Sequence, residues 1–132
     1  MIKLMILFIT LTSCQNKTLD ENNIVGEWKV TEFINGTIDI SPSLIEEAKN
    51  IALSTTYVFK DDNTFSMNSS FENINGTWDY NADENIIIMI YNSQYKDNVK
   101  DKQQISNFHQ NKMTWKYTYG EFGYTEMVLS KK

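Results

Sequence analysis

Residues 24–33, IVGEWKVTEF, have the pattern of a β-strand and decide how the rest of the chain is interpreted. Apolar and polar side chains alternate along them, as in a strand that faces a core on one side and solvent on the other. Similar short runs follow at intervals of about eight to twelve residues, separated by turn-forming Asn, Asp and Gly. This spacing is typical of antiparallel strands joined by tight turns, so the sequence predicts one all-β domain over residues 24–132.

Seven more strands are expected after the first one. Tight turns are predicted at residues 61–63 and 81–85, and residues 92–101 are interpreted as a polar loop. Consecutive hairpins without a long crossover favour an up-and-down antiparallel barrel, because closure removes the exposed edges of an open sheet. The expected strands are 55–60 (TTYVFK), 64–69 (TFSMNS), 77–81 (TWDYN), 85–91 (NIIIMIY), 102–110 (KQQISNFHQ), 112–120 (KMTWKYTYG) and 124–131 (YTEMVLSK).

Two features of this pattern carry specific expectations. Asn35-Gly36 favours a hairpin turn, in which both central residues adopt positive φ. The run at 85–91 is apolar on both faces, and we expect Ile88 to point into the barrel. A strand of this kind is either covered on its outer face, here by the predicted helix, or placed at an interface.

One short helix is predicted at residues 41–53, after the first strand. Ser41 is suited to capping its start, and Pro42 suits the first helical position. Its apolar residues recur at helical spacing, and the face that they form is expected to cover the sheet or close one end of the barrel. That face consists of Leu44, Ile45, Ala48, Ile51 and Ala52.

Short motifs in this order resemble a known family. Gly26-Glu27-Trp28 matches the G-x-W signature of lipocalins, and the later Y-x-F strand, acidic turn, TFSM and NGTWDY resemble the lipocalin-like lipoproteins of Bacteroidota. The resemblance covers roughly residues 24–130 and implies a lipocalin-like barrel of about eight strands. In typical lipocalins an arginine packs over the tryptophan, but this chain contains no arginine. Trp28 is therefore expected to be covered differently, for example by a lysine stem.

The N-terminal residues have the features of a bacterial lipoprotein signal. Lys3 precedes an apolar run that is too short to span a bilayer, and Leu11-Thr12-Ser13-Cys14 resembles a lipobox. The alternative is a buried N-terminal strand or helix. The resemblance implies that residues 1–13 are removed as a signal peptide and that Cys14 becomes the first residue of the mature protein, carrying a diacylglycerol and a further acyl chain.

Residues 14–23 indicate how and where the protein is anchored. Residues 14–23 comprise the lipidated cysteine and a polar tether, QNKTLDENN, without periodicity. Gln15 is not the aspartate of the familiar inner-membrane retention signal. We therefore expect a protein anchored by lipid to the outer membrane of a bacterial cell envelope, facing either the periplasm or the cell surface.

Composition argues against several classes of function. A net charge of −5 and the lack of arginine disfavour nucleic-acid recognition. One cysteine and one histidine, His109, cannot assemble an internal disulfide or a metal cluster. Pairs of carboxylates occur in predicted turns or on the helix, where no pair is placed to face another across a cleft, and the single thiol is expected to be lipidated. We therefore expect a protein that is not an enzyme and has no cofactor or resident metal ion.

The leading hypothesis is the binding of a small apolar ligand in or at the barrel, because an eight-stranded barrel has room for one. The alternative is that its own bulky side chains fill it. A buried fatty-acid carboxylate would lack an arginine partner in a largely uncharged cavity, so we expect a neutral or weakly polar ligand. The candidate interior residues are Trp28, Tyr57, Phe59, Phe65, Met67, Trp78, Tyr80, Ile88, Trp115, Tyr117 and Met127.

A second hypothesis is a membrane-tethered protein-binding module, such as an immunity, inhibitor or assembly lipoprotein. The tyrosines Tyr91, Tyr95, Tyr119 and Tyr124 favour it, because tyrosine combines apolar area with a polar tip. A connected internal cavity of roughly 300 Å³ or more would favour ligand binding, and a solid barrel with an exposed tyrosine patch would favour a partner.

Overall fold

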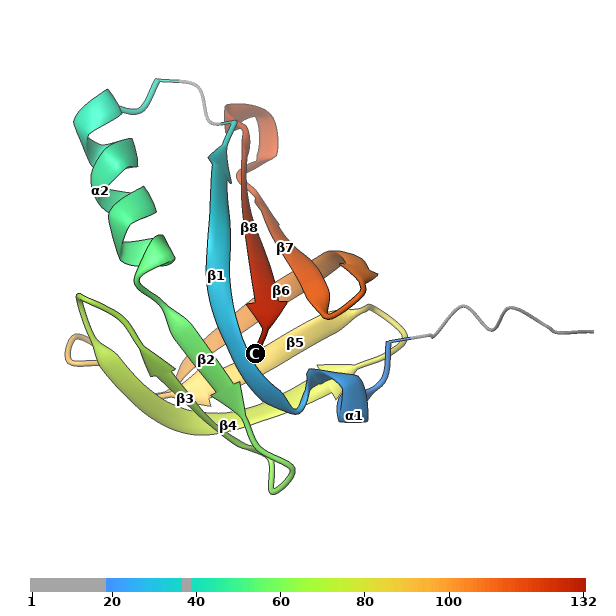
Figure 1. The fold of residues 1–132 in the computed structure, drawn as a ribbon. Helices are drawn as coiled ribbons and strands as arrows, with labels where there is room; N and C mark the ends of the chain where they lie inside the picture. The colour runs from blue at the N-terminus through green and yellow to red at the C-terminus, as the bar shows by residue number, and fades with distance from the viewer. Residues whose placement is uncertain (1–18, 37–38) are drawn as a thin grey trace, which may run out of the picture.

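The computed structural model of the chain describes residues 19–36 and 39–132. Its eight strands form one closed barrel in which each strand pairs antiparallel with its sequence neighbours and the last pairs with the first (Figure 1). The predicted up-and-down barrel is therefore confirmed. The strands are β1 (Gly26–Asn35), β2 (Thr56–Phe59), β3 (Thr64–Asn68), β4 (Asn73–Asn81), β5 (Ile86–Tyr91), β6 (Val99–His109), β7 (Lys112–Thr118) and β8 (Tyr124–Lys131).

Three short helical segments accompany the barrel, namely α1 (Glu21–Ile24), α2 (Pro42–Leu53) and η1 (Gly120–Phe122). Helix α1 overlaps residues 14–23, which were predicted to be a polar tether, and includes Ile24, the first residue of the predicted strand. Asp20 caps it, since its Oδ1 accepts a hydrogen bond from the Asn23 N–H at 3.0 Å. Leu19 packs against the core. The folded domain therefore begins before residue 24, and the remaining tether residues and Cys14 lie outside the described residues.

The up-and-down topology gives the barrel two different ends (Figure 1). We call the end that carries α1 and the tight turns 60–63, 82–85 and 110–111 the closed end. We call the opposite end the open end, and it carries α2 and the connections 69–72, 92–98 and 119–123. Two of the closed-end turns, 60–63 and 82–85, correspond to the turns predicted from the sequence. Asn63 and Asn85 adopt positive φ there, as turn asparagines do.

The closed end is sealed around Trp28. The side chains of Ile24 and Trp28 are fully buried, and the indole Nε1 donates a hydrogen bond to the Ile24 carbonyl at 2.7 Å. Lys131 Nζ donates to the Asn23 carbonyl at 3.0 Å and covers the indole ring, so a lysine covers Trp28 as expected. Gly26 has a φ of 139°, and a Cβ placed there would lie 2.5 Å from Lys131 Cε. Glycine in the G-x-W motif thus leaves room for this lysine stem.

The two Asn-Gly pairs, 35–36 and 75–76, do not form hairpin turns. After Asn35-Gly36 the chain continues to α2, so the expected hairpin at this position is wrong. Gly76 lies inside β4, opposite Phe65 and Tyr91 on the neighbouring strands. A Cβ at Gly76 would collide with the Ile90 carbonyl oxygen and both aromatic side chains. The missing side chain allows the rings of Phe65 and Tyr91 to meet edge to face at 6.0 Å.

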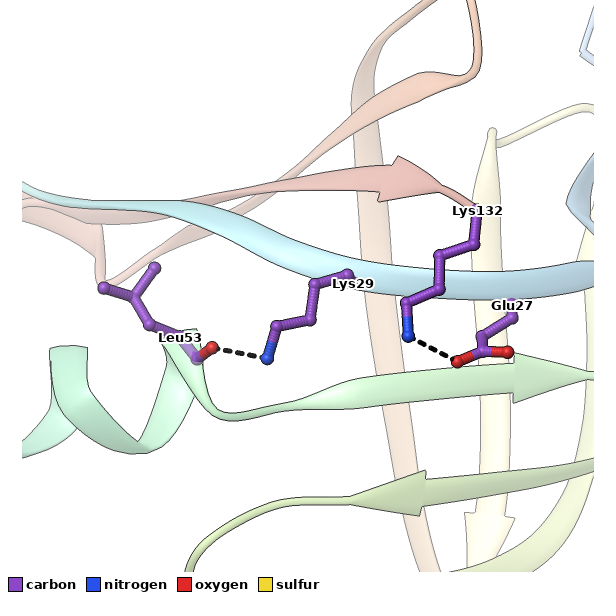
Figure 2. A network of polar contacts seen from close by, with 4 residues as sticks. All are labelled: Glu27, Lys29, Leu53 and Lys132. Atoms are coloured by element: carbon purple, nitrogen blue, oxygen red, sulfur yellow. Dashed lines mark hydrogen bonds and ion pairs between the residues drawn. The ribbon is translucent and has the colours of Figure 1, made fainter.

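Helix α2 stands at the open end beside β1 (Figure 1). Pro42 is its first residue as predicted, but the Ser41 side chain does not cap it and instead hydrogen bonds Ser43 Oγ at 2.8 Å. At the other end of α2, Lys29 Nζ donates to the Leu53 carbonyl at 2.7 Å (Figure 2). A cation at this position satisfies a terminal carbonyl and complements the helix dipole. Lys29 therefore fixes the C-terminal end of α2 to the first strand.

Nearer the start of β1, the side chain of Lys132 forms an ion pair. Lys132 Nζ lies 2.8 Å from Glu27 Oε1 (Figure 2).

Helix α2 lies beside the open end of the barrel, so the expectation that it covers the outer face of residues 85–91 is wrong. Ile90 on that face is exposed.

Candidate ligand-binding site

A cavity of about 580 Å³ lies between α2 and the open end of the barrel. We call it the open-end cavity. Its walls come from β1, α2, β6, β7 and β8, so residues far apart in the sequence contribute to it. The lining residues are Phe33, Ala48, Ile51, Ala52, Gln103, Trp115, Tyr117, Tyr119, Thr125 and Met127. Most are apolar or aromatic, which is typical of sites for small apolar molecules.

The apolar face of α2 forms one wall of this cavity. Of the predicted face, Ala48, Ile51 and Ala52 line the cavity, and only Ala52 is buried. Leu44 at the N-terminal part of the same face is 59% exposed. An amphipathic helix normally buries its apolar stripe against the protein. Here much of that stripe borders open space, so an occupant of the cavity would complete its burial.

Below the cavity the barrel is filled by side chains. Six of the predicted interior residues are buried: Trp28, Tyr57, Phe59, Phe65, Trp78 and Trp115. The Tyr57 and Trp115 rings meet edge to face at 4.8 Å, and those of Phe59 and Trp78 at 5.2 Å. The alternative that bulky residues fill the interior is therefore correct for this part of the barrel. Trp115 also lines the open-end cavity, so it forms the boundary between the two regions.

The other predicted interior residues do not share one location. Met67, Tyr80 and Met127 are partly buried and pack against the core. Tyr80 belongs to the closed end, where its hydroxyl donates to Asn85 Oδ1 at 2.7 Å. Tyr117 is 53% exposed but lines the open-end cavity together with Met127.

Ile88 is on the wrong face in the sequence-based prediction. Its neighbours Ile87 and Met89 are almost fully buried, so alternation along β5 places Ile88 on the outer surface. Ile88 lies opposite Asp79 and Lys102, both exposed. The strand is apolar on both faces, and nothing in its own composition selects between the two phases.

A carboxylate lies beside the cavity. In β6 the less exposed residues alternate as Val99, Asp101, Gln103 and Ile105, which places Asp101 on the inner face. Gln103 Nε2 donates a hydrogen bond to Asp101 Oδ1 at 2.9 Å. Burial raises the pKa of Asp101, and the hydrogen bonds from Gln103 and from the Lys102 backbone oppose this only in part.

Two phenols share this region with Asp101. Burial raises the pKa of Tyr57 on β2 and of Tyr91 on β5, and the charge of Asp101 adds to both effects. Tyr91, one of the tyrosines suggested for a protein interface, therefore points into the barrel, where its ring contacts Phe65. Asp101 is thus a carboxylate among aromatic groups, next to a cavity predicted to be largely uncharged.

Comparison with known families agrees with this geometry. The family model GH43_C, described as a C-terminal lipocalin-like domain, matches residues 10–125. The chain belongs to this lipocalin-like family. Comparison with curated proteins gave no match.

Two solved structures resemble the fold of this lipocalin-like protein. One is a DUF4847 family protein from Bacteroides vulgatus ATCC 8482, with 17% identity and a TM-score of 0.51 over 85% of this chain and 96% of that one. The other is an uncharacterized protein from Bacteroides eggerthii DSM 20697, with 16% identity and a TM-score of 0.53 over 82% of this chain and 98% of that one. At these identities the likeness concerns the fold.

Sequence reasoning missed several residues of the lipocalin-like barrel. Asp101 was not recognised, because the start of β6 was interpreted as a polar loop and its Lys-Asp-Lys run resembles a solvated segment. Gln103 lies in the strand predicted at 102–110 but was not identified as a site residue. The alternation from Val99 to Ile105 was the available signal. Residues missed in the core are Ile24, Val30, Ile74, Ile87, Met89, Ile105, Met113 and Leu129.

Metal-ligating side chains do not cluster in the described part of the lipocalin-like chain. Residues 19–36 and 39–132 contain no cluster of three or more His, Cys, Asp or Glu side chains that could hold a metal ion. Among the described helices, none has the length and hydropathy needed to cross a bilayer. His109 is exposed at the end of β6. Asp62 accepts hydrogen bonds from the Thr64 N–H and hydroxyl, which lower its pKa and identify a turn-stabilising role.

Proposed function

We propose that this protein is a lipid-anchored, non-catalytic lipocalin-like lipoprotein that binds a small apolar molecule in the open-end cavity. The observation that carries the proposal is the apolar stripe of α2, of which Ala48, Ile51 and Ala52 line this cavity while only Ala52 is buried. The volume of about 580 Å³ lies within the usual range for small-molecule sites. A ligand there would contact both the helix and the aromatic floor at Trp115.

The polar groups near the cavity argue against a fatty acid as the ligand. The chain contains no arginine, and the charged side chain beside the cavity, Asp101, is itself an acid. A ligand carboxylate would lose its hydration and meet a charge of the same sign. We therefore propose an apolar ligand whose polar end is not a carboxylate.

The position of the tether supports an orientation for the anchored protein. The described chain enters the barrel at the closed end, through Leu19 and α1 (Figure 1). An acylated Cys14 would hold that end toward the outer membrane, and the open-end cavity would face away from it. Ligand would then enter from the aqueous side.

The test is native mass spectrometry of the protein purified from its own membranes. We expect a retained apolar molecule that lacks a carboxylate. Ala48→Phe should obstruct the cavity and remove the molecule, whereas Lys49→Phe, one position along α2 and outside the cavity lining, should retain it. A stoichiometric fatty acid, or a molecule retained equally by both variants, would contradict the proposal.

A second candidate function is binding of a protein at the open end. Its support is a rim of exposed aromatic side chains on the open-end connections, namely Phe71, Tyr95, Tyr119 and Phe122. Phe71 and Tyr95 come from different connections, yet their rings stack at 6.3 Å. The same mass measurement would identify this function if a protein subunit, and no small molecule, remained bound.

A further inference from the structure

We infer that the molecule bound in the open-end cavity is an apolar amine, recognised by the Asp101–Gln103 pair and by the aromatic side chains around it. This inference rests on the proposed function and specifies its ligand class. It is carried by the position of a carboxylate and its hydrogen-bonded amide on the inner face of β6 and by the chemistry of the cavity wall.

The first step is the orientation of Asp101. Its sequence neighbours Lys100 and Lys102 are both exposed and alternate to the outer face, so neither accompanies it into the barrel. The residues opposite Asp101 and Gln103 on β5 are Met89 and Ile87, which are buried and apolar. The side-chain partner of Asp101 is therefore the neutral Gln103 amide. A cation on the ligand would provide a positive charge opposite this carboxylate.

The second step concerns Gln103, which lines the cavity itself. Its amide nitrogen donates to Asp101 Oδ1 at 2.9 Å. Because one amide group carries both donors and acceptor, this bond fixes which end of the side chain faces the carboxylate and leaves the carbonyl oxygen as an acceptor. An ammonium group matches this acceptor and the carboxylate behind it, whereas a ligand carboxylate would oppose two acceptors.

The third step is the aromatic wall. Trp115, Tyr117 and Tyr119 all line the cavity, and the rings of Tyr117 and Tyr119 meet edge to face at 4.7 Å and 65°. Aromatic faces attract cations, and several rings around one site form the usual recognition element for ammonium ligands. The same rings provide apolar area for the body of the ligand. An apolar amine therefore satisfies both halves of the site.

The test uses three probes that share one ring system and differ in their polar end: 2-naphthylmethylamine, 2-naphthylmethanol and 2-naphthoic acid. Binding to the full chain in phosphatidylcholine nanodiscs is measured by calorimetry, and the Ala48→Phe variant supplies the background from lipid. We expect the amine to bind about tenfold more tightly than the alcohol, as for a hydrogen bond to a charged group, and the acid to bind most weakly.

Two substitutions separate recognition from general charge. Asp101→Asn should remove the preference for the amine over the alcohol. Asp83→Asn removes one negative charge from an exposed turn at the closed end, and it should keep that preference. Circular dichroism of each variant verifies that the barrel is folded.

The outcomes distinguish the inference from the proposed function. Equal binding of the three probes, tighter binding of the acid, or an unchanged amine preference in Asp101→Asn would overturn the inference while the cavity remained a ligand site. If no probe bound the wild type above the Ala48→Phe background, both the inference and the proposed function would fail.

Discussion

The ammonium nitrogen of Lys131 lies 5.5 Å from the centroid of the Trp28 ring. The two residues are register partners in the pairing of β1 with β8, the joint that closes the barrel. Lys131 also reaches the carbonyl of Asn23 in α1. One lysine therefore connects the first strand, the last strand and the helix that covers the closed end.

Replacing Lys131 with methionine should destabilise the barrel by about 1 kcal/mol, because the cation–π contact and one hydrogen bond are lost while the apolar stem is kept. Urea unfolding followed by tryptophan fluorescence measures the change. The matched control is Lys132→Met, which removes the exposed ion pair with Glu27 and should cost less than about 0.5 kcal/mol. Equal urea midpoints for the two variants would show that the contacts of Lys131 stabilise the barrel no more than the exposed ion pair of Lys132 does.

Gly26→Ala should be more damaging than Gly120→Ala. Both glycines have positive φ, so both substitutions carry backbone strain on the order of 1 kcal/mol. A Cβ at Gly26 also meets the Lys131 stem, whereas a Cβ at Gly120 has no atom within 4 Å. Thermal unfolding of the two variants should place Gly26→Ala lower. A larger loss for Gly120→Ala would contradict the steric role assigned to Gly26.

Asp101→Asn should stabilise the protein at neutral pH. Burial raises the pKa of Asp101, so the folded chain keeps this proton to a higher pH than the unfolded chain does. Stability is therefore lost as the pH rises from the unfolded pKa through the folded one, and the loss is complete above both. The phenols that face Asp101, Tyr57 and Tyr91, have raised pKa values and stay protonated at neutral pH.

The measurement is urea unfolding of wild type and Asp101→Asn at pH 7 and at pH 3. The advantage of the variant should be present at pH 7 and shrink at pH 3, where the wild-type carboxyl is protonated. Asp62→Asn provides a control of opposite sign, since Thr64 lowers the pKa of Asp62 and its contribution to stability is lost as the pH falls. A variant at Asp101 that is less stable at pH 7 would contradict the assignment.

Cys14→Ser should abolish stable membrane attachment of the proposed lipoprotein. Without the thiol no diacylglycerol can be attached, and the protein should appear as an uncleaved or soluble, mislocalised precursor with an intact barrel. Fractionation with immunodetection compares it with Ser13→Ala, which keeps a small residue at that lipobox position. Mature Cys14→Ser protein in the membrane fraction would contradict the proposed anchor.

Much of the barrel could be predicted because strand alternation and turn chemistry are local properties. The eight strands and the turns around Asn63 and Asn85 follow from residues close together in the sequence. The inward phase of β5 could not be predicted, because Ile87 and Ile88 are chemically equivalent and only their neighbours differ. Helix α1 has four residues, too few for a periodic signal.

The candidate site was harder to predict because it depends on contacts across the barrel. Trp115 and Tyr117 were identified by alternation, but the part that α2 plays in the cavity follows only from its position over the open end. Asp101 illustrates the same limit. A single acid between two lysines is typical of a solvent-exposed segment. The alternation from Val99 to Ile105 is a weak local signal for its inward orientation, and the pairing of β6 with the buried residues of β5 makes that orientation clear.

The joint between β1 and β8 also has a consequence for the order of folding. Trp28 and Lys131 belong to the first and last strands of the barrel, so the barrel cannot close until β8 is available. Contacts between such distant residues require a large loss of chain entropy first, and proteins dominated by them fold slowly. We therefore expect closure to be a late kinetic event. A chain released before its last strand would present two unpaired edges, so the C-terminal residues protect the protein from aggregation as well as completing it.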